Sequence, residues 1–421
     1  MRANTQVRIR GGHHLKDFQK NGLIMVVLTT LASGINYICQ IGLGRVMSVS
    51  SFGVMNSLFS LILVLSVPGT SVNMIAARQI AQCADNAGAC ALTIYQLRRV
   101  SLCIGSFLLC GIVLLSIPMG AVLDTTPVMV VLAGLAATLS FFPSLISGVL
   151  TGKAAFWAAG IFSLIVPLVK VCGIIAAGGV LAEEVKQLVV MSAVAFGNIV
   201  AVLIAWRVLF PSAAAQSPDA RHSHMSIPGT MLAVNFLYLL LGNGDIFLVV
   251  TYFGTEKAGI YSAAMLFGKI LFFFTTAVVS VLLPYISKAS GKGEGVSPIF
   301  RSAFAVTLAV SVVGFLPFNL FPTAYIRLLY GANYIEAAPL VPYSCAVAIF
   351  ASLLNLELNC FVGMGKERRM LVHLSIALVG LLLLSAVFHA SVPALLTVLA
   401  AVLGILVAIE LPACLRGQTI P

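Results

Sequence analysis

Four ionisable side chains lie inside long apolar runs of this sequence and have the clearest capacity for chemistry. Lys170 and Lys269 can attract an anion, while Asp245 and Glu357 can pair with a cation or exchange a proton. An ionisable group within a hydrocarbon layer costs at least a few kcal/mol unless it faces water or a partner. These residues are therefore either binding groups of a polar cavity or members of structural ion pairs.

Each of the four has two interpretations. The lysines either line a cavity for an anionic substrate, or snorkel to the interface and form structural pairs. Asp245 is a structural partner of either lysine, or a site for a coupling ion or proton. Glu357 is a gate that contacts Lys366 or Arg368, or a substrate-binding group. Glu410, near a helix end, is predicted to be interfacial.

The composition is that of a membrane protein. The chain is 60% hydrophobic and 9% charged, whereas about a quarter of residues are charged in ordinary soluble domains. The net charge of +11 comes from charges scattered singly between apolar runs, with no basic domain. Membrane orientation explains such charges better than nucleic-acid binding does.

The apolar runs predict an all-α integral membrane protein with about 12 transmembrane helices, because about 20 apolar residues cross a bilayer. A polar loop with Arg78, Arg98 and Arg99 is predicted between the second and third. The expected spans are residues 22–44, 52–75, 101–122, 128–150, 154–178, 185–210, 230–250, 255–290, 300–321, 338–361, 370–389 and 392–411.

The hydropathy pattern repeats at half length. The run that begins at Phe52-Gly53-Val54 is echoed about 206 residues later, within 255–290, and 150–153 is echoed by 363–366. Half-length duplication is characteristic of transporter folds. The repeat predicts two pseudo-symmetric six-helix bundles, and one lysine in each bundle would suit a central cavity that accepts an anion.

The predicted domains follow this division. Residues 1–21 form a cytoplasmic basic N-terminus, 22–210 the N-lobe, 211–228 a cytoplasmic linker, 229–411 the C-lobe and 412–421 a cytoplasmic tail. With both termini inside, 18 of the Lys and Arg residues lie on the cytoplasmic side and four outside, as the positive-inside rule requires. The four outside are Arg45, Lys186, Lys257 and Arg327.

The sequence does not favour an enzyme. It has no HExxH or Walker motif, and its nine cysteines lack metal-ligand spacing and do not indicate a disulfide framework. Its predicted outer loops are too short for a catalytic domain. We therefore predict no catalytic residue, no metal and no cofactor.

Three stretches carry a resemblance to a known family. They are SSFGVMNSLFSLILVL at 50–65, MIAARQIAQ at 74–82 and GDIFLVVTYFGTEKAGIYSAAMLF at 244–267. The chain resembles the polysaccharide-flippase branch of the multidrug/oligosaccharidyl-lipid/polysaccharide exporter superfamily, which includes the Wzx-type O-antigen flippases. The resemblance implies two six-helix lobes around a central cavity that opens alternately inward and outward.

The same resemblance implies the cargo: an undecaprenyl-pyrophosphate-linked oligosaccharide moved from the cytoplasmic to the periplasmic leaflet of the cell inner membrane. This step would serve assembly of O-antigen, capsule or exopolysaccharide. Membrane lipids, H⁺ or Na⁺, and the polysaccharide polymerase and chain-length machinery are the implied partners. The alternative is a cation-coupled drug or metabolite efflux transporter of the same superfamily, although a carrier of cationic drugs should place acids rather than lysines in its cavity. A non-transport scaffold is a third hypothesis.

Overall fold

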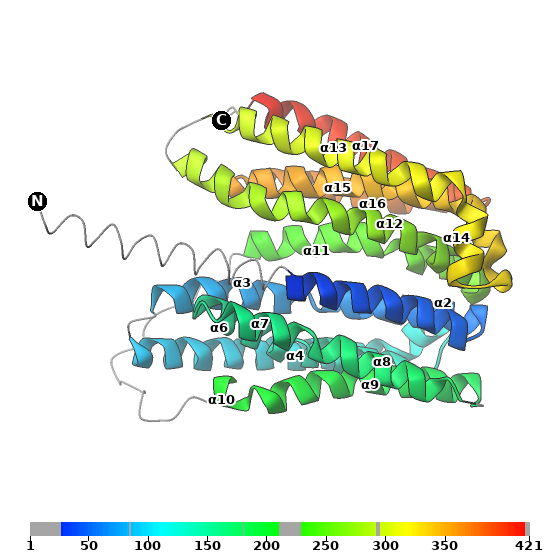
Figure 1. Ribbon diagram of the computed structural model, residues 1–421, viewed down its shortest axis with the longest axis horizontal. Coiled ribbons are helices and arrows are strands. Elements are labelled where there is room, and N and C mark those ends of the chain that lie inside the picture. The colour runs from blue at the N-terminus through cyan, green and yellow to red at the C-terminus, as the bar shows by residue number, and fades with distance from the viewer. Residues whose placement is uncertain (1–26, 84–85, 180, 210–228, 292–294, 417–421) are drawn as a thin grey trace, which may run out of the picture. The chain divides into compact units, whose positions relative to one another are not determined.

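The computed structural model describes residues 27–83, 86–179, 181–209, 229–291 and 295–416. Their regular secondary structure is helical (Figure 1). The predicted N-terminal segment 1–21, the linker 211–228 and the end of the tail lie outside the described residues. Helix contacts divide the chain into unit 1, residues 1–42, 68–116 and 128–227, and unit 2, residues 43–67, 117–127 and 228–421.

Unit 1 contains most of the first half of the chain. Its first helix, Val27–Val46, runs into unit 2 at its end, and α4 also extends beyond the unit. The other helices are α3 (Val67–Gln82), α4 (Ala87–Val122), α5 (Pro127–Leu139), α6 (Phe141–Gly152), α7 (Phe156–Ser163), α8 (Ile165–Ala177), α9 (Glu183–Ile204) and α10 (Trp206–Leu209).

Unit 2 combines an early helix with the second half of the chain. Within it, α12 packs against α2, α13 and α15, and α15 packs against α17 (Figure 1). Its helices are α2 (Val49–Leu65), α11 (Gly229–Asn243), α12 (Asp245–Gly291), α13 (Ser297–Leu320), α14 (Pro322–Leu329), η3 (Ala332–Leu340), α15 (Val341–Gly363), α16 (Glu367–Val387) and α17 (Val392–Arg416). The predicted lobe boundaries follow chain order, whereas these units follow contacts, so the lobe boundaries stay a prediction.

The described helices account for the predicted crossings. Ten are long and apolar enough to span a membrane, and α2 with α3 forms an eleventh, bent by 41°. One of the ten, Leu232–Thr276, has 45 residues, about twice the length that one crossing needs. Its backbone leaves the helical conformation at Gly254, where φ is 80°. Counting it as two crossings gives 12 within the described residues, and the chain is a multi-pass membrane protein.

Prolines determine where several spans break. A proline has no N–H to donate to the carbonyl four residues earlier. Pro143 therefore leaves the Leu139 carbonyl without its helical partner, and α5 ends at that residue. Pro167 does the same at Ser163, where α7 ends. Pro68 is the second residue of α3 and lies beside the 41° bend between α2 and α3.

The predicted polar loop before the third span is wrong, because most of it is helical: Arg78 lies inside α3. Arg98 and Arg99 lie inside α4, which begins at Ala87. The Arg98 side chain donates a hydrogen bond from Nη1 to the Leu209 carbonyl, 3.3 Å away, at the end of α10. A cation is favourable there because the last carbonyls of a helix lack helical donors.

The backbones of α2 and α12 cross at two glycines. A Cβ atom on Gly53 would lie 2.1 Å from the Thr255 carbonyl oxygen, and one on Gly259 would lie 1.9 Å from the Val49 carbonyl oxygen. The two contacts are reciprocal, because Gly53 and Gly259 are 206 residues apart in the sequence, as are Val49 and Thr255. This crossing supports the predicted internal repeat. Only glycine permits so close an approach.

We predict that Gly259→Ala destabilises the protein. The added methyl group would force α2 and α12 apart, and overpacking of this kind costs about 1–3 kcal/mol. Thermal unfolding of the purified protein in detergent measures the loss. Gly380→Ala is the matched control, because a Cβ atom at Gly380 meets nothing within 4 Å; equal melting temperatures for the two variants would contradict the close crossing.

Candidate functional site: buried ionisable residues of the spans

Asp245 begins α12 and is almost fully buried, with 6% of its surface exposed. Gly244 separates it from the end of α11, so the carboxylate lies at a helix N-terminus, where negative charge is favourable. The Tyr261 hydroxyl donates a hydrogen bond to Oδ2, and the Ile246 N–H donates to Oδ1 at 3.0 Å. The carboxylate is therefore held by its own helix.

Lys269 lies on α12 eight residues beyond Tyr261 and interacts electrostatically with Asp245. Unlike Asp245 and Tyr261, it is exposed at the surface of the protein. The ion pairs of the described residues do not include Asp245, so its pairing with either lysine stays a prediction.

Lys170 lies in unit 1, in the middle of α8, and only 8% of it is exposed. It interacts electrostatically with Cys39 of the first helix. The Cys39 thiol in turn donates to the Pro167 carbonyl oxygen at 3.9 Å, one turn from Lys170. Because Lys170 and Lys269 belong to different units, a cavity lined by both stays a prediction.

Glu357 lies on α15 and is completely buried. Neither of its carboxylate oxygens has a hydrogen-bond partner. Among the ion pairs of the described residues, none joins Glu357 to Lys366 or Arg368. Its role as a gate stays a prediction.

Glu410 is the functional candidate that sequence reasoning missed. Its expected place at the membrane interface stays a prediction, and within the protein it is completely buried on α17. Two basic partners come from α16: Arg369, whose Nε lies 2.9 Å from Oε2, and His373, whose Nδ1 contacts Oε1. Arg369 and His373 are spaced four residues apart on α16, so they share one helix face. That spacing opposite an acid in the next apolar run is the signal that could have found the cluster.

Two of the cations predicted outside have structural partners within unit 2. The Arg45 guanidinium donates to the Leu329 carbonyl oxygen at 2.7 Å and also to that of Leu328, so it caps the end of α14. Lys257 pairs with Glu336 at 2.7 Å, and both side chains are exposed. These structural contacts explain the presence of both cations, so no role in substrate binding needs to be assigned to them.

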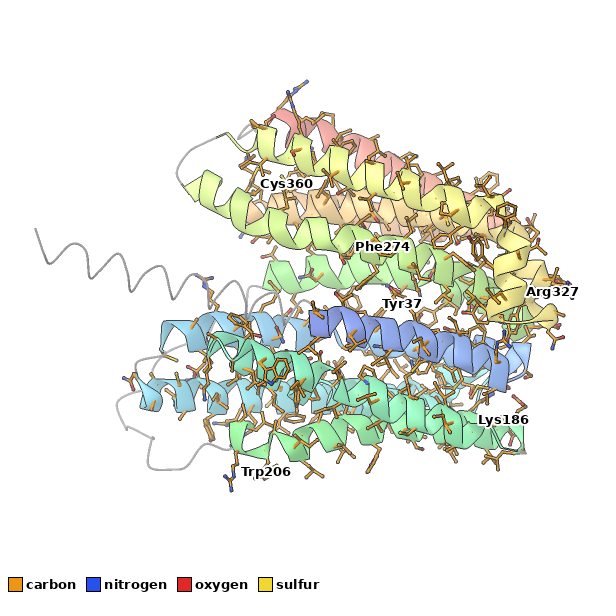
Figure 2. The ribbon with its side chains drawn as sticks, viewed as in Figure 1. Tyr37, Lys186, Trp206, Phe274, Arg327 and Cys360 are labelled. Carbon is orange, nitrogen blue, oxygen red and sulfur yellow. The ribbon has the colours of Figure 1, made fainter. Side chains whose placement is uncertain are left out.

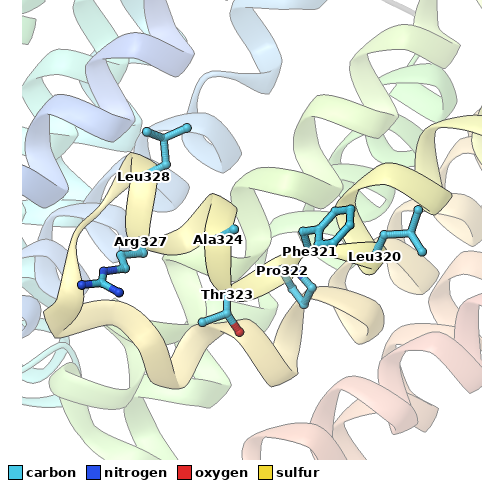
Figure 3. A pocket seen from close by; sticks show the side chains of 7 residues that line it. All are labelled: Leu320, Phe321, Pro322, Thr323, Ala324, Arg327 and Leu328. Carbon is cyan, nitrogen blue, oxygen red and sulfur yellow. The ribbon is translucent and has the colours of Figure 1, made fainter.

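A surface hollow of about 710 Å³ lies where α13 meets α14 (Figure 3). Figure 2 places Arg327, which lines it, at the end of unit 2 opposite to Cys360 on α15. The buried acids therefore do not contribute to this hollow. Its lining is mostly apolar and consists of Leu320, Phe321, Pro322, Thr323, Ala324, Arg327 and Leu328.

Comparison with solved structures decides the fold. A structure described as the inward-facing conformation of a multidrug resistance MATE family transporter of the MOP superfamily matches with a TM-score of 0.73. The match has 11% sequence identity and covers 93% of this chain and 97% of the other. The chain has the MATE transporter fold.

Further structures share the MATE fold. An outward-facing conformation of a multidrug resistance MATE family transporter matches with a TM-score of 0.66 and 13% identity, covering 94% of this chain and 95% of the other. A MOP superfamily transporter from Pyrococcus furiosus is described as having a binding pocket of reverse polarity that suggests a different function. It matches with a TM-score of 0.63 and 16% sequence identity, covering 94% of this chain and 95% of the other. No protein-family model matches the sequence, and no curated protein is similar to it in sequence.

We predict that Glu410→Ala destabilises unit 2. Removing one partner of a buried ion pair costs about 3–5 kcal/mol, and about 1–3 kcal/mol is expected here because Arg369 and His373 are 35% and 29% exposed. Thermal unfolding in detergent measures the loss. Glu336→Ala breaks the exposed pair with Lys257 and should cost less than about 1 kcal/mol. If both variants lost the same stability, the burial of Glu410 would be contradicted.

Proposed function

We propose that this protein moves an undecaprenyl-pyrophosphate-linked oligosaccharide from the cytoplasmic to the periplasmic leaflet by alternating access, for surface polysaccharide assembly. Known structures of the MATE fold include inward-facing and outward-facing conformations, which supports alternating access. The polysaccharide-flippase resemblance of 50–65, 74–82 and 244–267 supports the cargo. The proposed location is the cell inner membrane with both termini cytoplasmic.

The observation that carries the proposal is the charge of Lys269 within the apolar run of α12. Lys269 lies inside a span and is exposed, while the neighbouring Asp245 is buried and accepts hydrogen bonds from Tyr261 and Ile246. A cation in a medium of low dielectric constant attracts the pyrophosphate more strongly than it would in water. We propose that Lys269 and Lys170 bind the anionic head group, that Asp245 modulates their charge, and that Glu357 acts at a gate.

The alternative is a cation-coupled efflux transporter for drugs or metabolites. It is favoured by the matching structures of multidrug resistance transporters. For one MOP superfamily transporter with the same fold, a binding pocket of reverse polarity is described as suggesting a different function. A carrier of cationic drugs needs exposed acids in its cavity, whereas the exposed ionisable residue within the apolar run that follows Glu256 and Lys257 on α12 is Lys269.

We predict that deleting the gene in its native host causes undecaprenyl-linked oligosaccharide to accumulate while surface polysaccharide is lost. Lipid extraction with mass spectrometry, and staining of the surface glycan, measure the two effects. A plasmid copy of the gene is the control and should reverse both. An unchanged lipid pool and glycan together with greater sensitivity to cationic drugs would favour efflux instead.

We predict that Lys269→Ala lowers complementation of this deletion by about 10- to 100-fold. A hydrogen bond to a charged group contributes about 1.5–3 kcal/mol, and 1.4 kcal/mol corresponds to a factor of ten. Lys269→Arg should retain much of the activity because it keeps the charge. Lys257→Ala, which removes a cation from an exposed ion pair, is the control and should complement normally.

Lys170→Ala tests the second lysine in the same assay at equal protein levels. A loss comparable to that of Lys269→Ala is expected if both cations contact the head group. Normal transport by both lysine variants would contradict a cationic binding site.

A further inference from the structure

The strongest unassigned feature is a cluster of ionisable residues at one end of α15, α16 and α17. Glu357 on α15 and Glu410 on α17 are both completely buried. Arg369 and His373 come from the first two turns of α16. Figure 2 shows Cys360, one turn beyond Glu357, at this end of unit 2. The positive-inside count predicts that this end is cytoplasmic.

The two acids have different surroundings. Arg369 lies 2.9 Å from one oxygen of Glu410, and the His373 Nδ1–H donates to the other. Glu357, by contrast, has no hydrogen-bond partner for either oxygen. It interacts electrostatically with Glu410 and with the thiol of Cys360. An ionised carboxylate that is buried without a partner is costly.

The charges of the cluster balance in two arrangements. Glu410 and Arg369 neutralise each other, which leaves Glu357 and His373. The cluster is neutral when Glu357 carries a proton and His373 is neutral, or when Glu357 is ionised and His373 carries a second proton on Nε2. In both arrangements the His373 Nδ1–H bond to Glu410 is kept. Loss of that one proton leaves a net negative charge in the cluster.

We infer that Glu357, Glu410, Arg369 and His373 form a binding site for one exchangeable proton, held by either Glu357 or His373. The proton enters from water and returns to water, so no other reactant is needed. His373 and Arg369 have partly exposed side chains, at 29% and 35%, which gives the proton a route to the buried Glu357. Arg369 and Glu410 position His373 and fix the charge of the site.

A proton fits this cluster better than a metal ion does. Sodium and calcium need several oxygen ligands, and both oxygens of Glu410 already contact Arg369 and His373. The thiols of Cys360 and Cys414 also lie near the acids. Even so, in the part of the chain that the structure describes, no group of His, Cys, Asp and Glu has a geometry that could hold a metal.

Proton binding at this site would couple transport to a proton gradient, a step that rests on the proposed function. Binding of the proton to this site can be measured in the absence of any transported substrate. Purified protein in lipid nanodiscs is examined by pH-difference infrared spectroscopy, in which a protonated carboxyl group gives a C=O band separate from that of carboxylates. We expect a band that persists above the pH at which exposed carboxyl groups ionise, and we expect Glu357→Gln to abolish it.

Controls separate the site from general effects. Glu336→Gln changes an exposed carboxylate and should leave the band intact. His373→Gln removes one of the two positions for the proton, so the band should persist to higher pH than in the unaltered protein. This second variant keeps the inference testable if Glu357→Gln does not fold.

Three outcomes would overturn the inference. They are an unaltered protein without the band, a band that Glu357→Gln retains, and a band that disappears on adding NaCl but not choline chloride at fixed pH. The last result would indicate a sodium site. The titration needs no lipid-linked sugar, so normal flipping without the band would refute only the proton site. The band without lipid accumulation in the deletion strain would refute only the proposed cargo.

Discussion

The energetic cost of charge within apolar helices determines how this protein places its few ionisable residues. Asp245 receives hydrogen bonds from Tyr261 and Ile246, and Glu410 contacts Arg369 and His373. Each of these acids is compensated within its own unit. Lys269, on the same helix as Asp245, is exposed at the surface of the protein. Glu357 alone among these acids is buried without a hydrogen-bond partner, so protonation is the simplest way to relieve its charge.

A second constraint is the need for helices to approach closely without a driving force from water. Membrane helices associate through small residues that let backbones meet. Gly53 and Gly259 do this at equivalent places of the internal repeat, in the crossing of α2 and α12. The internal repeat is therefore reflected in a pair of equivalent backbone contacts, although few residues are identical between the two halves of the sequence.

Apolar runs predicted the fold well because each span is a local property of the sequence. The second span, bent at Pro68, and the division of Leu232–Thr276 at Gly254 both follow from single residues. The loop around Arg98 was mispredicted because its helix is stabilised by a distant partner, the carbonyl of Leu209. The charges of neighbouring residues in the sequence do not reveal a contact with a residue so far along the chain.

The candidate site was predictable only in part, for the same reason. Buried charges such as Asp245 and Glu357 stand out in any apolar run. The partners of Glu410 come from another helix, 37 and 41 residues earlier in the chain, so the four-residue spacing of Arg369 and His373 on that helix was the one local signal of the cluster. The MATE fold does not supply the missing information, since the matching structures are at most 16% identical among those described above and the fold hosts different functions.

The most direct test of the central claim is a flipping measurement in proteoliposomes that contain the purified protein and labelled undecaprenyl-pyrophosphate oligosaccharide. A glycosidase added outside digests only the sugar of the outer leaflet. The account predicts that the whole lipid pool becomes digestible with the protein present, and about half of it in protein-free liposomes. Digestion that stops at half in both preparations, while a cationic drug is transported, would contradict it.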